Sequence, residues 1–194
     1  MYFYNRMVTS DSSRLLYCAE INGRRNLYLM ELATGDAVQL TEGDALDDYG
    51  AMISADDKSV YYQQDRKVWK LDLATLQRTC LYAAPDGWDC GNWGMSDDNR
   101  YLVMTETRRD TLPDLTGKKG WEFFPLTCAA KPLCHIVYLD TQTGEHHIVV
   151  EDRCWFGHAQ LRPGDPDTIL FCHEGPYDMI DARLWLIQSD GSRY

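Results

Sequence analysis

A repeated motif constrains the fold of this 194-residue chain more than any other feature. Three segments share a turn rich in Ser and Asp that leads into a short apolar run, and a fourth segment is a looser copy. The four segments are SDSSRLLYCAE (10–20), SADDKSVYYQQ (54–64), SDDNRYLVMTE (96–106) and PGDPDTILFCHE (163–174). Self-similarity of this kind is typical of repeat architectures, in which each copy is one supersecondary unit.

A second element follows each copy and indicates a strand, a tight turn and an outer strand. The four examples are NLYLMELATGDAVQL, KVWKLDLATLQRTCL, HIVYLDTQTGEHHIVV and RLWLIQSDGSRY. β-Branched and aromatic residues alternate at period two in the strands, and Asp, Gly, Ser and Asn occupy the turns. Leu27 and Val68 lie about 41 residues apart, which is the length of one four-stranded propeller blade. No long segment shows a convincing helical period.

The pattern predicts an all-β fold: a β-propeller of four-stranded antiparallel blades, with about four blades present and the propeller therefore incomplete and open. The expected blades are 1–47, 48–89, 90–154 and 155–194, the last without its outer strand. The third is longer because of an insert at about 107–133, and inserts of this length are usually lids or binding loops. An open propeller exposes sheet edges, so we expect a fragment of a larger propeller or self-association through those edges.

The composition excludes several classes of partner. The net charge is −11, from 30 acidic and 19 basic residues. Phosphate contacts need Lys and Arg, so we expect no nucleic-acid binding and no adhesion to an anionic membrane. The seven cysteines form no C-x-x-C pair and indicate reduced, mostly buried thiols. No apolar run is as long as a membrane span and the first residues lack signal-peptide features, so we expect a cytoplasmic protein.

The innermost strands of a propeller surround its channel, and their aromatic and polar residues are therefore candidates for a ligand pocket. The expected inner strands are MYFYNRMVT, DYGAMIS, CGNWGMS and WFGHAQLRP. These strands carry Tyr2, Tyr4, Tyr49, Trp93, Trp155 and His158. For each aromatic residue the alternative is packing between blades.

The stretch CHEGPYDMIDAR (172–183) concentrates polar chemistry around a Gly-Pro turn. His173 follows an apolar strand, and convergence with His158 would suit a general base or a metal ligand, because neutral imidazole serves both near pH 7. The alternative is a structural histidine.

Carboxylates and a guanidinium occupy the rest of this stretch. Arg183 stands at the start of the strand LWLIQ, where its guanidinium could hold a ligand carboxylate bidentately. The alternative is a salt bridge to Asp178 or Asp181. Glu174 and Asp181 could orient a histidine or bind an arginine, or could be ordinary solvated or paired carboxylates.

Two other polar patterns indicate structure rather than function. His146 and His147 are adjacent on a strand and point to opposite faces, so we expect surface residues. The Asp pairs at 56–57 and 97–98 recur with the repeat, and a feature shared by all repeats belongs to the scaffold. Asp side chains bind backbone groups and so stabilise such turns.

The chain resembles the oligogalacturonate lyases, a family of pectin-degrading β-propeller enzymes. The resemblance runs from about Tyr2 to Ser192 and rests on FCHEGPYDMIDARLWLI, YFYNRMVTSDSSRLLY, LDLATL and WFGH…RP. The H-E-G-P-x-D-x-x-D-A-R-x-W run is the specific part, because Ser-Asp turns occur in many propellers. The resemblance implies about seven blades, of which this chain supplies the N-terminal half.

The resemblance also implies an activity. The family cleaves short α-1,4-linked oligogalacturonates by β-elimination and releases 5-keto-4-deoxyuronate. A histidine is the base, and further His and Gln residues hold a divalent ion, typically manganese. Those residues fall beyond this sequence, so the chain alone should bind no metal and show little activity. Arg183 matches the Arg at the substrate carboxylate, and His158 and His173 match residues near the pocket.

Two alternatives remain at this point. The chain could be a non-catalytic, TolB-like propeller that serves as a binding or scaffold module, or a truncated product that folds poorly because its blade faces are exposed. An acidic protein that binds an acidic sugar also requires a locally positive pocket, which Arg183 and other cations would provide.

Overall fold

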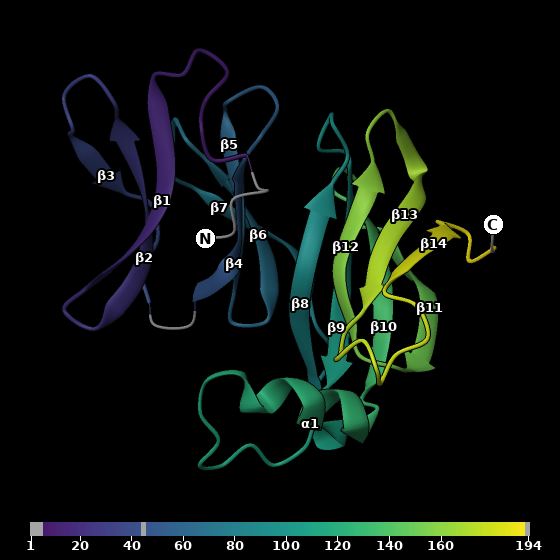
Figure 1. Ribbon diagram of the computed structural model, residues 1–194. Helices are drawn as coiled ribbons and strands as arrows, with labels where there is room; N and C mark the ends of the chain where they lie inside the picture. The colour runs from purple at the N-terminus through teal and green to yellow at the C-terminus, as the bar shows by residue number, and fades with distance from the viewer. Residues whose placement is uncertain (1–5, 44–45, 193–194) are drawn as a thin grey trace. The chain divides into compact units, whose positions relative to one another are not determined.

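The computed structural model describes residues 6–43 and 46–192, with the side chains of residues 47–49 outside the description. The strands form four antiparallel sheets of three or four strands, and consecutive strands are neighbours in every sheet (Figure 1). The predicted all-β class is therefore confirmed. The chain divides into two compact units, Met1–Ala83 and Ala84–Tyr194, and each is described by itself.

The first unit contains two sheets. One consists of β1 (Arg14–Ile21), β2 (Arg24–Glu31) and β3 (Ala37–Gln39), and the other of β4 (Leu46–Ile53), β5 (Ser59–Gln64), β6 (Lys67–Asp72) and β7 (Arg78–Ala83). The alternating apolar residues of both sheets form one core, which includes Leu16, Leu27, Ile53, Val60 and Leu71. No helix crosses 27–40, which forms parts of β2, β3 and the turn between them.

The expected inner strand at the N-terminus is only partly described. Tyr2, Tyr4 and the Tyr49 side chain lie outside the described residues. The backbone of the following segment contacts both sheets of the first unit. Leu16 N–H donates to Met7 O over 2.7 Å, and Ile53 N–H donates to Arg6 O over 2.8 Å.

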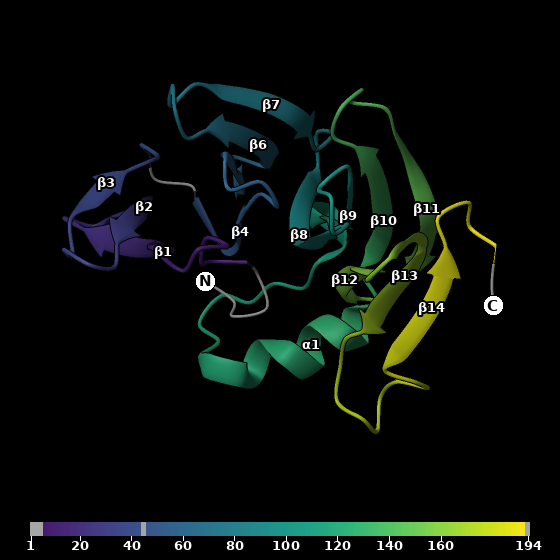
Figure 2. The same ribbon diagram turned by 90° about the horizontal axis from the view of Figure 1, so that it is seen from above.

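The second unit also contains two sheets. One consists of β8 (Trp88–Met95), β9 (Tyr101–Arg108), β10 (Leu133–Asp140) and β11 (His146–Arg153), and the other of β12 (Phe156–Arg162), β13 (Asp165–His173) and β14 (Leu184–Gln188). β12 packs beside β8 and β9 (Figure 2). Gly94 permits this approach, because a Cβ there would lie 3.1 Å from the Ala159 carbonyl oxygen. Ile136, Phe156 and Ile169 belong to the shared core.

The insert of the third repeat is partly helical, which the sequence analysis did not predict. It contains two short 3₁₀ segments, η1 (Arg109–Thr111) and η2 (Gly120–Glu122), followed by the helix α1 (Phe123–Ala130). Eight residues, FFPLTCAA, cover little more than two turns, too few to display a helical period. The helix tolerates its proline because it falls in the first turn. In the described part of the chain, no helix has the length and apolar character needed to cross a membrane.

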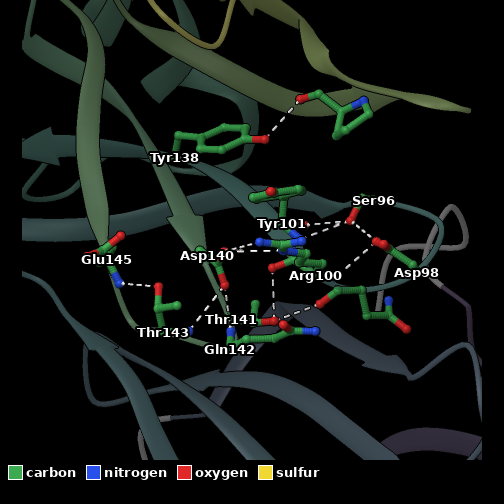
Figure 3. Close-up of polar contacts among 12 residues, drawn as sticks. Ser96, Asp98, Arg100, Tyr101, Tyr138, Asp140, Thr141, Gln142, Thr143 and Glu145 are labelled. Atoms are coloured by element: carbon green, nitrogen blue, oxygen red, sulfur yellow. Dashed lines mark hydrogen bonds and ion pairs between the residues drawn. The ribbon is translucent and has the colours of Figure 1, made fainter.

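The Ser-Asp turns have the scaffold role that the sequence predicted (Figure 3). Ser96 Oγ donates to Asp98 Oδ1 over 2.7 Å, the Arg100 N–H donates to the same oxygen, and the Tyr101 N–H donates to Ser96 Oγ. The hydroxyl and backbone donors keep the pKa of Asp98 below its usual value. Equivalent bonds occur at Ser54 with Asp56 and at Thr9 with Asp11.

The neighbouring acidic residue of two of these turns connects one sheet to the next. Within the first unit, Asp57 accepts a hydrogen bond from the Ser10 N–H at 2.9 Å and pairs with Arg6 at 3.0 Å. Within the second unit, Asp97 accepts one from the Gly164 N–H at 2.8 Å. The repeated carboxylates therefore hold turns and join sheets.

Candidate active site

The candidate site forms where the chain leaves β13. The His173 N–H donates to Arg183 O over 2.9 Å, and the Glu174 N–H donates to Trp155 O over 2.7 Å. The loop from 174 to 183 thus begins beside β12 and returns beside β14. These backbone bonds bring His158, Glu174 and Arg183 together, although they lie up to 25 positions apart in the sequence.

The Glu174 carboxylate is the centre of this group. The residue is only 6% exposed, and its Oε2 accepts a hydrogen bond from Arg183 Nη2 at 2.7 Å. Its Oε1 lies 3.3 Å from His158 Nε2 but has no hydrogen bond of good geometry among the described residues. A buried carboxylate is costly unless it is paired, so Glu174 holds the guanidinium and faces the imidazole at once.

A β-bulge places His158 opposite this carboxylate. Gly157 pairs with Cys172 and Gln160 with Leu170, which leaves one extra residue on β12. His158 lies in the bulge with a φ of 52°, in the left-handed region. The preceding glycine is needed for close approach, because a Cβ at Gly157 would lie 2.7 Å from Cγ of Glu174.

Arg183 is oriented from several sides. Its Nη1 donates to Gly175 O over 3.2 Å, and its guanidinium lies 5.9 Å from the Phe124 ring and 5.7 Å from the Tyr177 ring. Its ion pair is with Glu174, so the alternative of a salt bridge to Asp178 or Asp181 is wrong. The side chain keeps 29% of its surface exposed, and a guanidinium has five N–H donors, more than these two bonds use.

His173 has a different environment. Its ring stacks on Trp185 at 4.5 Å and on Phe156 at 5.5 Å between centroids, with an interplanar angle of 22° in both cases. Burial lowers its pKa, which favours the neutral ring. The structure therefore gives His173 a packing environment, while its predicted role in substrate binding stays a prediction.

Neither Cys172, which is buried, nor Cys154, which is half-buried, has the character of a nucleophile. Burial raises the pKa of Cys172, and burial raises the pKa of Cys154 to about 12. Thiols with such pKa values are protonated near neutral pH and inert.

The remaining predicted residues differ in their surroundings, and Trp155 adjoins the site because its carbonyl oxygen accepts the hydrogen bond from the Glu174 N–H. Trp93 is completely buried, as expected for packing. Trp155 is half-buried and makes edge contacts with Phe123 and Phe124 of α1 at 6.1 and 5.5 Å. His146 and His147 are exposed, as predicted.

Sequence reasoning missed a second histidine–carboxylate pair. His135 Nε2 lies 2.5 Å from Glu106 Oε2, both residues are buried, and Trp88 stacks on the imidazole at 3.9 Å. The four residues Cys90, Glu106, His135 and Glu151 are successive cross-strand partners from β8 to β11. The available signal was polar residues inside apolar strands, but only the strand register shows that they form one row.

The described residues do not fit a metal centre. Among residues 6–43 and 46–192, no group of three or more His, Cys, Asp or Glu side chains could hold a metal ion.

Comparisons with known proteins agree on one family. The family model described as oligogalacturonate lyase matches residues 1–194. A curated oligogalacturonate lyase from Dickeya dadantii (strain 3937) is 38% identical over 98% of this chain and 49% of its own length. An oligogalacturonide lyase from Pectobacterium atrosepticum is 37% identical over the same shares. The chain thus spans about half the length of these relatives.

Solved structures give the same result. An oligogalacturonate lyase in complex with manganese superposes with a TM-score of 0.92 and 39% identity, covering 99% of this chain and 51% of that one. TolB from Acinetobacter baumannii superposes with a TM-score of 0.60 at 15% identity, which supports the predicted propeller-type fold and nothing about function. From the match along its whole length and its identity to the curated relatives, the chain belongs to the oligogalacturonate lyase family.

Proposed function

We propose that this chain forms the uronate-binding part of an oligogalacturonate lyase, which cleaves short α-1,4-linked oligogalacturonates by β-elimination and yields 5-keto-4-deoxyuronate. The names of the relatives and their identity along this whole chain support the reaction class. The Arg183 guanidinium, oriented by Glu174 yet still partly exposed, is the observation that carries the assignment to a site.

The chemistry explains why an arginine is suited to this position. In β-elimination a base removes the proton next to the carboxylate, electrons form the new C=C bond, and the glycosidic C–O bond breaks. Negative charge develops on the uronate carboxylate during proton removal. A guanidinium that holds this carboxylate stabilises the developing charge more than the ground state, and so lowers the barrier.

The neighbours of Arg183 have supporting roles in this proposal. Glu174 fixes the guanidinium and lies 3.3 Å from His158 Nε2, and we place the imidazole at the edge of the bound sugar acid. His173 contributes through its stacked ring and through its backbone bond to Arg183. We assign the general base to none of these residues.

The manganese of the solved relative has no site among the described residues, so we derive no step through a metal. We further propose that the protein is cytoplasmic. No observation favours a TolB-like scaffold role, because that likeness rests on the fold alone.

Isothermal calorimetry with digalacturonate tests the proposal. Arg183→Lys keeps a charge but loses the forked geometry, and we expect at least about tenfold weaker binding. Arg183→Ala would leave the Glu174 carboxylate buried without its partner, which could unfold the protein. The double variant Arg183→Ala/Glu174→Ala removes both charges, so a loss of affinity in this variant reports on binding and not on folding. Arg162→Ala is the matched control, because Arg162 is 65% exposed and pairs only at the surface. Unchanged affinity in the folded Arg183 variants would refute the assignment.

A further inference from the structure

Two highly exposed aromatic side chains lie near the candidate site. Trp121 is 77% exposed and Tyr177 is 82% exposed, more than any other large hydrophobic residue described. Trp121 belongs to η2, directly before α1, and Tyr177 belongs to the loop that carries Arg183. Large apolar side chains in water are the informative exception to burial, and grouped ones mark binding surfaces.

A continuous series of contacts connects these two rings through the site. Trp121 makes an edge contact with Phe124 at 6.0 Å. The Phe124 ring lies 5.9 Å from the Arg183 guanidinium, and the Tyr177 ring lies 5.7 Å from it. We call Trp121, Phe124 and Tyr177 the aromatic rim. The rim therefore extends outward from the group that we assign to the uronate carboxylate.

The base of the rim is firmly packed. Phe123 and Phe124 make edge contacts with the half-buried Trp155, and Trp121 stacks on Phe123 at 5.7 Å. Gly175 approaches α1 so closely that a Cβ there would lie 3.0 Å from Cβ of Cys128. Figures 1 and 2 both show α1 beside the loop that follows β13. A fixed aromatic surface loses little conformational entropy when it binds a ligand.

The insert also has the charge that an acidic ligand requires. Between Arg108 and Lys131 it carries five basic residues and three acidic ones, whereas the whole chain has a net charge of −11. The side chains of Lys118 and Lys119, next to Trp121, are exposed. A local excess of positive charge attracts anions although the protein as a whole is acidic.

We propose that the aromatic rim is a binding site for the sugar rings next to the one held by Arg183, so that it selects oligomers over monomers. A uronic acid ring has a C–H face that packs on an aromatic ring and a carboxylate that pairs with Lys or Arg. The aromatic rim supplies the aromatic rings, and the basic residues of the insert supply the positive charge. The identity of the ligand rests on the proposed function.

The test compares ligands of different length. Calorimetry measures binding of galacturonate, digalacturonate and trigalacturonate to the wild type, Trp121→Ala, Tyr177→Ala and Trp121→Phe. We expect each alanine variant to bind trigalacturonate about five- to tenfold more weakly and the monomer within about twofold of the wild type. Trp121→Phe should retain most of the affinity. Val38→Ala, at a residue 57% exposed on β3, is the control for loss of surface apolar area.

The outcomes separate this inference from the proposed function. Unchanged affinity for trigalacturonate in both alanine variants overturns the proposal for the aromatic rim. It does not affect the assignment of Arg183 to the uronate carboxylate. An equal loss for monomer and trimer also overturns it, because the rings would then act only through Arg183. A wild type that binds none of the three ligands refutes both proposals. If analytical ultracentrifugation shows that Trp121→Ala abolishes self-association while sugar affinity is unchanged, the surface binds a second copy and the inference is wrong.

Discussion

Acidic residues have different roles in two regions of the second unit. At the Ser96 turn and the turn after Asp140, carboxylates accept hydrogen bonds from backbone N–H groups and nearby hydroxyls (Figure 3). At the end of β13, the Glu174 carboxylate instead bonds one side chain and faces another. The turn after Asp140 even borders a surface hollow of about 640 Å³, lined by Tyr101, Tyr138 and His147.

The difference shows that neither polar residues nor a hollow is enough to identify a site. A carboxylate satisfied by its own turn has little capacity left for a ligand, and it recurs with the repeat because every turn needs it. The Glu174 carboxylate, in contrast, binds the Arg183 side chain and is not satisfied by backbone donors of a Ser-Asp turn. Four substitutions test this contrast, and they follow from the largest expected effect to the smallest.

Gly157→Ala should have the largest effect. The new Cβ would overlap the Glu174 side chain, and overpacking of this kind costs about 1–3 kcal/mol of unfolding free energy. Because Glu174 must then move, we also expect digalacturonate affinity to fall at least about tenfold. Urea unfolding and calorimetry measure the two effects. Affinity equal to that of the wild type would show that the position of Glu174 does not matter for binding.

Asp98→Ala should affect stability alone. The turn loses the acceptor of two hydrogen bonds, which corresponds to about 1–2 kcal/mol of unfolding free energy. Digalacturonate affinity should stay within about twofold of the wild type. If affinity falls together with stability, the division between scaffold turns and site is wrong. Asp114→Ala, in an exposed turn of the insert, controls for loss of one negative charge.

His173→Phe should change the pH dependence of stability. Burial lowers the pKa of His173 below 6.5 in the folded state, so the unfolded chain binds the proton first as the pH falls. Wild-type stability should therefore decline from pH 6.5 downward until the folded pKa is passed, and the phenylalanine variant should lack this decline. Digalacturonate affinity at pH 8 should be retained, and a loss there would restore a direct role for His173 in binding.

Asp11→Asn should have the smallest effect. Hydrogen bonds from Thr9 and Ser13 lower the pKa of Asp11 to about 2, compared with an ordinary value of 3.8. The stabilisation is present above the unfolded pKa and is lost as the pH falls through the folded one, between about 4 and about 2. Urea unfolding measures the unfolding free energy between pH 5 and pH 2. This free energy should fall less steeply with decreasing pH in the variant than in the wild type. Identical slopes would show that the carboxylate is not held by its turn.

The sequence predicted those parts that depend on local patterns. Alternation identified the strands, and the Ser-x-Asp spacing identified the turns, because each involves contacts within a few residues. The helix α1 was missed because eight residues are too short to show a period. The His135–Glu106 pair and the bulge at His158 were missed because they depend on strand register, which pairs residues far apart in the chain.

The candidate site could be predicted from the sequence only in part. Arg183, His158 and Glu174 could all be selected from residue type and position along the chain, and Glu174 was one of two carboxylates expected to orient a histidine or bind an arginine. That this one carboxylate binds Arg183 and also faces His158 could not be predicted. Sequence spacing favoured Asp178 or Asp181 as the partner of Arg183, yet the backbone bonds of the loop bring Glu174 to the guanidinium instead.

The pairing of β9 with β10 continues up to Thr107 and Cys134, on either side of the insert. The hairpin is therefore closed by its own ladder, and the segment it carries can be exchanged without altering the strands. A shorter, longer or differently charged loop can be grafted there onto the same strands, and in our proposal this would change the length of the oligomer that the site binds.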